Sequence, residues 1–362
     1  SDLKDISKLS QMGGRTIGIY IITTVVAVMI GLVMVNAINP GTRISEETRQ
    51  DLITAYQSDA EEKQAIAQQQ KDAGPLQALV DLVPDNIFKA TTENGNMLQV
   101  IFFALFFGVG LILVPAEKSK PVKDFFDGFN EVILRLIDLI MLVAPYGVFA
   151  LLAALIVESP SLDLFRALGM YAMTLVIGLV VMGIFYILIV RLFVKIKPKK
   201  FIEGIAPAQL LAFSTSSSAA TLPVTMERVE EHLGVDEEVA SFVLPIGATI
   251  NMDGTSLYQA VAAVFIAQAF GMDLDTGTQL TIVMTATLAS IGAAAVPGAG
   301  MVMLVIVLAQ AGIPEAGLAL IFAINRPLDM CRTVINITGD ASVSLLVAKS
   351  TGKLAKHSKE KK

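Results

Sequence analysis

Long runs of apolar residues constrain the fold of this 362-residue chain more than any other feature. A helix that crosses a lipid bilayer needs about 20 apolar residues, and the first such run extends over residues 16–37. Charged residues make up only 17% of the chain, whereas a soluble domain carries roughly 25%. The sequence therefore predicts an all-α polytopic membrane protein.

Five further apolar runs predict spans, at about residues 97–114, 132–157, 164–194, 239–270 and 318–347. A polar insert rich in Glu, Gln, Asp and Ala follows the first span, at about residues 39–75. The apolar region from residue 76 is interrupted by Pro84, Asn86 and the Asn94–Gly95–Asn96 turn, which predicts a broken helix ahead of the second span.

Two other apolar segments are too interrupted to be simple spans. Residues 201–226 have a Ser-rich centre at 214–223, and residues 279–311 have a centre of small residues and Pro at 290–300. Two short apolar arms around such a tip indicate a re-entrant helical hairpin, whose irregular backbone is tolerated only inside protein or beside a water-filled cavity.

The charges of the connecting segments indicate the orientation. Basic residues gather before the first span, at 118–123, at 191–200 and at the C-terminus, whereas the segments at 46–62, 158–163 and 273–275 are acidic. If basic segments face the cytoplasm, both ends of this chain are cytoplasmic and the two hairpins enter from opposite sides. Inverted repeats with broken helices are typical of secondary transporters, with the binding site near the midplane.

The last span carries several charged and polar residues. Asp329, Arg332, Thr333, Asn336 and Asp340 have the spacing of one helical face. A charge at the centre of a membrane helix costs about 2.5–3.5 kcal/mol on insertion scales, and such residues usually mark functional sites. The alternative is a structural ion pair between Asp329 and Arg332.

Residues 251–255 interrupt the span at 239–270. Asn251 and Asp253 offer side-chain oxygens and Gly254 weakens the helix. Hard cations prefer oxygen ligands, and unwound carbonyl groups hold sodium in many transporters. The alternative is a kinked helix with a solvated turn.

Two weaker features are open to simpler interpretations. The Ser-rich tip at 214–218 is either a flexible turn or a source of hydroxyl groups and helix N-termini that favour anions. Tyr20, Thr23 and Thr24 in the first span are compatible with ordinary helix packing.

Several classes of function have no support. The single cysteine, Cys331, rules out a disulfide framework and a Cys-rich zinc site. The two histidines, His232 and His357, lie in charged flanks, and no Gly-x-Ser-x-Gly motif is present, so we do not expect an enzyme. The net charge of −6 gives no support for nucleic-acid binding.

Four motifs together resemble one family. They are Asn251–Met252–Asp253–Gly254–Thr255, the Ser-rich tip ending in Thr221–Leu222–Pro223, Val296–Pro297–Gly298–Ala299–Gly300, and Asp329–Met330–Cys331–Arg332–Thr333 with Asn336 and Gly339–Asp340. In this order they look like the dicarboxylate/amino acid:cation symporter family, which includes archaeal aspartate transporters and animal excitatory amino acid transporters. The resemblance implies a homotrimer in which a static scaffold holds mobile transport domains that move like an elevator.

The resemblance also implies a substrate site. Arg332 would pair with the side-chain carboxylate of the substrate and Asp329 with its α-amino group, and the presence of both favours aspartate or glutamate. The remaining residues implied for this site are Ser216, Ser217, Ser218, Thr255, Val296, Gly300, Thr333 and Asn336.

Three sodium sites follow from the same resemblance, with no other cofactor. One would use Gly247, Asn251, Asn336 and Asp340, and a second would use Thr249, Met252, Ser290, Ile291 and Ala293. The third would use Tyr20, Thr23, Thr24, Asn251 and Asp253, which favours function over packing for the polar residues of the first span.

The expected function is therefore sodium-coupled symport of aspartate or glutamate across the plasma membrane, or the inner membrane of a bacterium. The alternatives are transport of C4-dicarboxylates or neutral amino acids, proton coupling, and a channel. Residues 1–196 would form scaffold and transport-domain helices, residues 197–350 the transport core, and residues 351–362 a basic cytoplasmic tail. The core would consist of a hairpin at 201–234, a broken helix at 238–270, a hairpin at 277–312 and a helix at 315–348.

The chain departs from the family pattern in a few places. The first two spans of the family are absent, so residue 1 falls near the start of the third. Relatives carry a second arginine at the position of Ser216 or Met330, and Arg326 is a candidate to replace it. Asn325 stands where an acidic residue is common, and Ala293 replaces a threonine.

Overall fold

The computed structural model describes residues 6–46, 49–50, 83–92, 97–158, 162–291, 295, 297–322 and 324–355. These residues are nearly all helical and contain no strand, apart from an isolated β-bridge between Val235 and Leu354. The prediction of an all-α protein is confirmed for this part of the chain. Most of the polar insert predicted at 39–75 lies outside the described residues.

The first half of the chain forms four long helices and two short helical turns in its described residues. They are α1 (Ile6–Ile38), a 3₁₀ turn (Pro40–Arg43), α5 (Ile87–Ala90), α6 (Met97–Leu113), α7 (Ala116–Glu158) and α8 (Leu162–Ile189), which continues as a π turn (Val190–Val194). Both α1 and α7 begin well before the apolar runs predicted at 16 and 132. Hydropathy marks the part of a helix suited to lipid, whereas the hydrogen-bonded helix continues through polar residues.

The second half contains two helix pairs, a broken helix and a final long helix. The pairs are α9 (Pro198–Thr215) with α10 (Ser218–Glu227), and α13 (Thr276–Ile291) with α14 (Ala299–Gln310). Between them lie α11 (Glu237–Ile250) and α12 (Asp253–Ala269), and the chain ends with α15 (Leu318–Phe322) and α16 (Asn325–Thr351). The non-helical tips at 216–217 and the break at 251–252 fall where the sequence predicted them.

The start of the last helix was predicted wrongly. A single helix was expected over residues 315–348, but a 3₁₀ turn (Glu315–Gly317) and the short α15 precede α16. Pro327 lies in the first turn of α16. Proline is tolerated there because its missing N–H would have no partner in the helix, whereas further inside a helix it removes a hydrogen bond.

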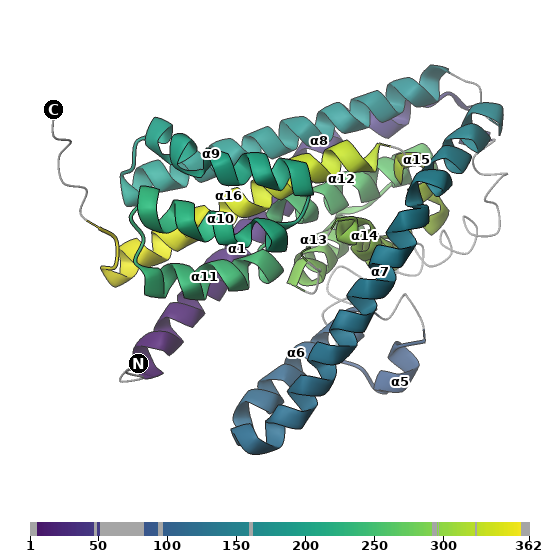
Figure 1. The fold of residues 1–362 in the computed structure, drawn as a ribbon. Helices are drawn as coiled ribbons and strands as arrows, with labels where there is room; N and C mark the ends of the chain where they lie inside the picture. Colours follow the sequence, from purple (N-terminus) through teal and green to yellow (C-terminus); the bar gives the residue numbers. More distant parts are fainter. Residues whose placement is uncertain are drawn as a thin grey trace.

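Helix α16 lies at the centre of the bundle (Figure 1) and contacts α8, α9, α11 and α12. Helix α1 runs along α12 and also contacts α8. The pair α6–α7 extends away from the bundle (Figure 1) and touches it at α13, α14 and α15. The bundle is therefore built from α1, α8 and the second half of the chain.

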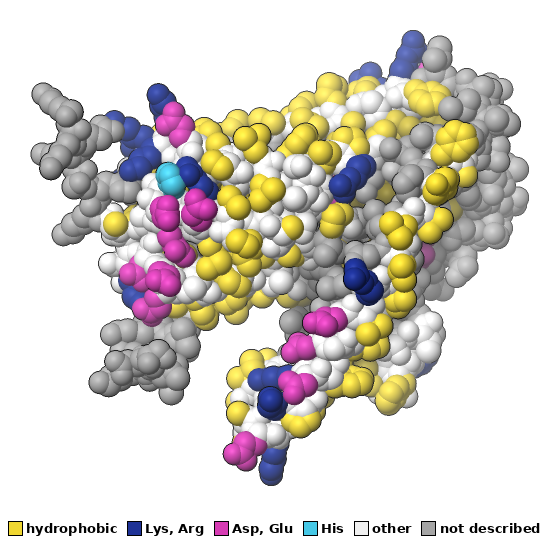
Figure 2. Space-filling model, viewed as in Figure 1, with side chains coloured by type: hydrophobic (Ala, Val, Ile, Leu, Met, Phe, Trp, Pro, Cys, Tyr) yellow, Lys and Arg dark blue, Asp and Glu magenta, His cyan; other side chains and the backbone are white. Residues whose placement is uncertain are grey.

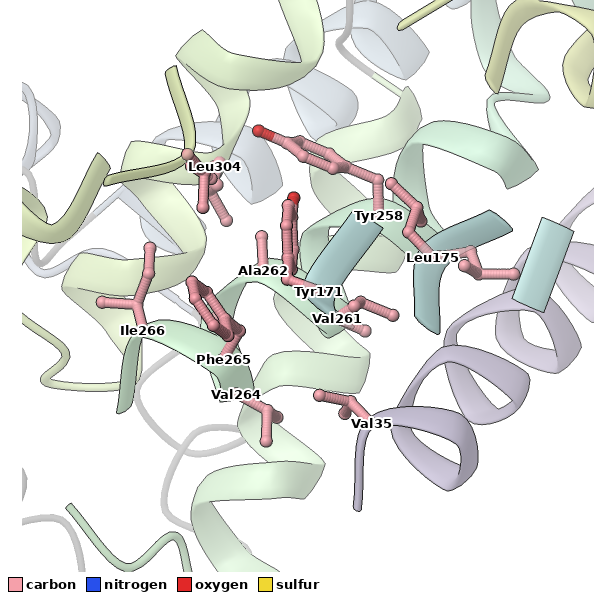
Figure 3. Packing of buried hydrophobic residues seen from close by; sticks show 14 of the residues in the cluster. Val35, Tyr171, Leu175, Tyr258, Val261, Ala262, Val264, Phe265, Ile266 and Leu304 are labelled. Atoms are coloured by element: carbon pink, nitrogen blue, oxygen red, sulfur yellow. The ribbon is translucent and has the colours of Figure 1, made fainter. Parts of the chain in front are cut away.

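Side chains of α8 and α12 form the largest buried cluster, part of which appears in Figure 3. Tyr171 and Phe265 pack with their ring centroids 4.8 Å apart, and Val35 of α1 and Leu304 of α14 belong to the same cluster. Within lipid, helices associate through close packing rather than through the hydrophobic effect. Small residues such as Ala262 allow neighbouring helices to pack closely against α12.

Two helical stretches in the described residues are long and apolar enough to cross a membrane: Met12–Arg43 and Asp163–Val194. In the most apolar window of each stretch, only 39% is buried inside the protein. Ile22 of the first stretch, for example, is 63% exposed. On the face in Figure 2, hydrophobic side chains are spread along the bundle, and acidic side chains gather at one end of it and on the α6–α7 arm. Apolar surface along the helices and charge at their ends suit a lipid environment.

Arg228 joins the two arms of the first helix pair. Pro207 lies inside α9 and has no N–H to offer the carbonyl group of Glu203. Arg228 Nη2 donates a hydrogen bond to that carbonyl over 3.4 Å, and its Nε donates to the carbonyl of Gly204 over 2.7 Å. A cation directly after α10 therefore satisfies backbone groups of α9.

Residues 352–355, here called the C-terminal strap, bind the connection between α10 and α11. The amide of Asp236 donates to the carbonyl of Lys353 over 3.1 Å, and the amide of Ala355 donates to the carbonyl of Gly234 over 2.8 Å. The strap therefore fixes this connection to the end of α16.

Two charged side chains hold the same end of the bundle. Lys353 of the strap forms an ion pair with Glu238 of α11. Arg15 Nη1 of α1 donates to the carbonyl of Ser350, 335 positions later in the sequence, over 3.1 Å. The first and last helices are therefore joined directly.

Candidate functional site

One face of α16 is polar and buried. The five residues predicted to share a face, Asp329, Arg332, Thr333, Asn336 and Asp340, are all buried, and Arg332 is completely buried. Their neighbours Ile335, Ile337 and Val343 contribute to hydrophobic clusters. The spacing in the sequence thus predicted correctly that these polar groups turn into the protein.

Arg332 and Asp329 form the ion pair that the sequence offered as one alternative. Arg332 Nη2 donates to Asp329 Oδ1 over 2.7 Å and to Asn325 Oδ1 over 3.0 Å. The guanidinium group lies 3.8 Å from the centroid of the Tyr258 ring, which is a cation–π contact. Nε and Nη1 of Arg332 are buried without a hydrogen-bond partner. A purely structural pair would leave two such costly groups unexplained.

The tips of the two helix pairs meet over Asp329. Ser217 Oγ donates to the carbonyl of Ala295 over 2.7 Å, and the amide of Gly298 donates to Asp329 Oδ2 over 3.0 Å. Ser216 adopts a left-handed conformation with φ of 53°, and its buried Oγ has no partner. The two tips are therefore joined by a hydrogen bond, and the second tip also binds the Asp329 carboxylate.

A cavity of about 10 Å³ lies beneath these tips. It has room for about one water molecule, so the tips must separate before a molecule of amino-acid size can enter. Its lining includes seven of the ten residues predicted for the substrate: Ser216, Ser218, Thr255, Gly300, Asp329, Thr333 and Asn336. Ser217 and Arg332 lie outside the lining, and Val296 lies outside the described residues.

The break between α11 and α12 brings the backbone of α12 against α16. The amide of Gly254 donates to Asn336 Oδ1 over 2.8 Å, and Asn336 Nδ2 donates to Thr255 Oγ1 over 3.3 Å. A Cβ atom at Gly254 would overlap the carbonyl oxygen of Arg332. Only glycine permits this approach, which explains the residue type at the break.

The first predicted sodium group is largely assembled. Asn251 Nδ2 donates to Asp340 Oδ1 over 2.9 Å. Gly247 packs against the Asp340 carboxylate and the hydroxyl of Tyr20. Asn336 lies one turn before Asp340 on α16 and is bonded to Gly254 instead.

The polar residues of α1 lie at the break, as the family resemblance implied. Thr24 Oγ1 donates to Asp253 Oδ1 over 2.6 Å, and Thr23 Oγ1 lies 3.5 Å from Asn251 Oδ1. Tyr20 donates its hydroxyl to the carbonyl of Val243 on α11 over 3.0 Å. Hydrogen bonds between helices are also a feature of ordinary helix packing, so these contacts are compatible with both interpretations.

The remaining predicted sodium group is not joined by hydrogen bonds in the described structure. Thr249 is exposed, and its hydroxyl donates to the carbonyl of Ile246 over 3.0 Å. Ser290 Oγ donates to the carbonyl of Thr287 over 2.8 Å, and the carbonyl of Met252 accepts the amide of Ser256 over 2.8 Å. The side chain of Ile291 is partly buried, and Ala293 lies outside the described residues.

The structure also identifies residues that the sequence did not. Arg326, the candidate second arginine, is exposed and does not line the cavity. Tyr258 and Asn325 contact Arg332 instead, and Tyr186 donates its hydroxyl to Asp253. In the sequence, the only indication that Asn325 belongs to the site is its place one turn before Asp329. For Tyr186 and Tyr258 the only indication is a polar atom in an apolar helix.

Fold and site together define a class of protein. It is a polytopic helical bundle with broken helices and buried charges at its centre. Residues 1–350 match the family model described as the sodium:dicarboxylate symporter family. The chain belongs to this family.

Three relatives illustrate the similarity. The chain is 34% identical to excitatory amino acid transporter 2 of Rattus norvegicus, over 93% of this chain and 66% of that protein. It is 35% identical to the proton/sodium-glutamate symport protein of Bacillus subtilis, over 95% and 78% of the two chains. It is 37% identical to excitatory amino acid transporter 3 of Oryctolagus cuniculus, over 96% and 74%. The chain thus spans slightly less than two thirds of the length of the transporter 2 relatives.

Proposed function

We propose that this protein is a sodium-coupled symporter of acidic amino acids, either aspartate or glutamate. The observation that carries the proposal is the buried pair of Asp329 and Arg332 in a bundle that also buries two carboxylates, Asp253 bonded to Thr24 and Asp340 bonded to Asn251. The names of the relatives, which refer to excitatory amino acids and to sodium and glutamate, support the same conclusion.

Substrate binding would exchange one ion pair for two. Asp329 would release Arg332 and accept the α-ammonium group of the substrate, while Arg332 would bind the side-chain carboxylate through two parallel hydrogen bonds. The unpartnered Nε and Nη1 of Arg332 are suited to this role. Arg332 and Asp329 each keep a partner before and after binding, which avoids the large penalty of leaving either charge isolated.

Sodium would bind beside each of the two carboxylates. Asp340 with Gly247 and Asn251 would form one site, and Asp253 with Thr23 and Thr24 would form another. Asn251 touches both groups, so occupation of one site affects the other. We expect the remaining set, Thr249, Met252, Ser290, Ile291 and Ala293, to form a third site.

The domain organisation follows the packing. Helices α1 and α8 contact α12 and α16, so they would move with residues 197–350 as the transport domain. Helices α6 and α7 extend away from this bundle (Figure 1) and would belong to a scaffold that forms a homotrimer. The two helix pairs would be re-entrant hairpins of an inverted repeat in the plasma membrane, with both ends of this chain cytoplasmic. Chemical cross-linking in membranes should then yield trimers.

Uptake into liposomes tests the proposed function. Purified protein should accumulate radiolabelled aspartate or glutamate against an inward sodium gradient and fail to do so with choline. Competition by succinate and serine decides between the proposed substrates and the C4-dicarboxylate and neutral amino acid alternatives. Flux that neither saturates nor accumulates substrate would indicate a channel.

Arg332→Ala tests the role of the guanidinium group. The variant should lose acidic substrates far more than neutral ones, because only the side-chain carboxylate loses its partner. Arg326→Ala is the matched control, since Arg326 is exposed on the same helix. Equal aspartate affinity in Arg332→Ala and wild type would contradict the assignment.

A further inference from the structure

Tyr186 is a buried residue that the proposed transport scheme does not use. It lies near the end of α8 and is completely buried. Its hydroxyl donates a hydrogen bond to Asp253 Oδ2, while Thr24 of α1 donates to the other oxygen, Oδ1, over 2.6 Å. Each oxygen of this carboxylate therefore receives one hydroxyl, and the two hydroxyls come from different helices.

The position of the Tyr186 hydroxyl is fixed by its surroundings. A Cβ atom at Gly339 of α16 would overlap this hydroxyl and would lie 2.7 Å from Asn251 Nδ2. The hydroxyl thus lies in close contact with α16 while it bonds to Asp253 of α12. Thr24 differs, because its hydroxyl also lies 2.8 Å from the carbonyl of Tyr20 and can rotate towards it.

The two oxygens of Asp253 consequently have different surroundings. Oδ1 faces Thr24, in the group that also contains Thr23 and Asn251. Oδ2 faces Tyr186. A cation bound at Oδ1 would leave the hydrogen bond from Tyr186 in place, because that bond uses the other oxygen.

We propose that Tyr186 is a positioning residue for the cation held by Asp253. Its hydroxyl keeps the carboxylate rotated so that Oδ1 faces Thr23, Thr24 and Asn251. Groups that hydrogen-bond to a ligating carboxylate orient it, and their removal typically lowers metal affinity by about 10–100-fold. The inference rests on the proposed function, since it presumes that sodium binds here.

The test compares Tyr186→Phe with Tyr171→Phe. Both tyrosines lie on α8 and are completely buried, but the hydroxyl of Tyr171 has no hydrogen-bond partner in the described structure. Figure 3 shows Tyr171 among hydrophobic side chains, beside Phe265. Both changes remove one oxygen and keep the ring, so Tyr171→Phe controls for the loss of a buried hydroxyl.

Sodium binding is measured without amino acid, as the rise in unfolding temperature with sodium concentration. The chain contains no tryptophan whose fluorescence could report unfolding, so unfolding is detected by light scattering. Choline chloride replaces sodium chloride to keep the ionic strength constant. We expect the sodium concentration for half-maximal stabilisation to increase about 10–100-fold in Tyr186→Phe and to stay unchanged in Tyr171→Phe. Thr24→Ala, which alters the same carboxylate, should shift the midpoint in the same direction.

Any of four results would overturn the inference. The midpoint in Tyr186→Phe could equal that of wild type, or the unfolding temperature could fall equally at all sodium concentrations, which would indicate a structural role alone. A shift in Thr24→Ala without a shift in Tyr186→Phe would likewise exclude Tyr186. If choline stabilises the wild type as well as sodium does, the proposed sodium coupling fails, and this inference fails with it.

Discussion

Replacement of Gly254 by alanine should separate α12 from α16. The added Cβ atom would overlap the carbonyl oxygen of Arg332 and would lie 3.0 Å from Asn336 Oδ1 and 3.1 Å from the carbonyl carbon of Arg332. Backbone atoms of a central helix cannot rotate away, so α12 itself must shift. Such overpacking costs about 1–3 kcal/mol. Loss of the 2.8 Å hydrogen bond from Gly254 to Asn336 adds about 0.5–1.5 kcal/mol.

The sum, about 1.5–4.5 kcal/mol, corresponds to a measurable change in unfolding temperature. An unfolding entropy of about 2.1 cal/mol/K per residue over 362 residues gives a decrease of about 2–6 °C. Sodium-dependent aspartate binding should weaken as well, because Thr255 and Asn336 line the cavity. Light scattering and radioligand binding provide the two measurements.

Gly18→Ala is the matched control for this prediction. A Cβ atom at Gly18 would have no heavy atom within 4 Å, and alanine favours a helix by about 1 kcal/mol over glycine. This variant should unfold at the same temperature as wild type or slightly higher. If Gly254→Ala behaves like Gly18→Ala, then α12 does not approach α16 as closely as described, and the reasoning about the break is refuted.

Three other predictions concern separate parts of the molecule. Asp340→Asn should raise the sodium concentration required for aspartate binding about tenfold or more; an unchanged sodium dependence would contradict a role for this carboxylate. Ala355→Pro removes the amide that binds Gly234, so limited proteolysis should cut the connection between α10 and α11 faster than in wild type; equal rates would show that the strap does not protect it. Burial, together with repulsion from Glu237, Glu231 and Asp236, raises the pKa of the Glu230 carboxyl above its usual value of 4.5. The folded state then binds this proton more tightly than the unfolded state, and stability decreases as the pH rises through that range. Glu230→Gln should therefore unfold at a higher temperature than wild type at pH 7 and at the same temperature near pH 4.

Local chemistry made much of the site predictable. A polar string such as residues 251–255 within an apolar run has few stable conformations in lipid, and the structure breaks the helix there. The charged residues of α16 share a face because their spacing requires it. The length of the helices was harder to predict, because α7 continues into polar residues that hydropathy excludes.

Contacts between helices that are far apart in the sequence could not be predicted from it. Tyr171 and Tyr186 are both single tyrosines within the apolar α8, yet one packs against Phe265 and the other donates to Asp253. Arg326 seemed as suitable as any basic residue for the site, but the direction of its side chain depends on how α16 begins. These distinctions arise from packing, which a single sequence does not encode in any local pattern.

The hydrogen bond between Arg15 and Ser350 has a consequence for synthesis of the protein. Its two residues are 335 positions apart, and at about 5–20 residues per second the ribosome needs about 20–70 s to make the intervening chain. During this time α1 lacks its partner at the end of α16, and Thr23 and Thr24 lack Asn251 and Asp253 until α12 is made. Until then the hydroxyls of Thr23 and Thr24 have the carbonyl of Tyr20 within α1 as their acceptor, and their contacts with α11 and α12 form only late in synthesis.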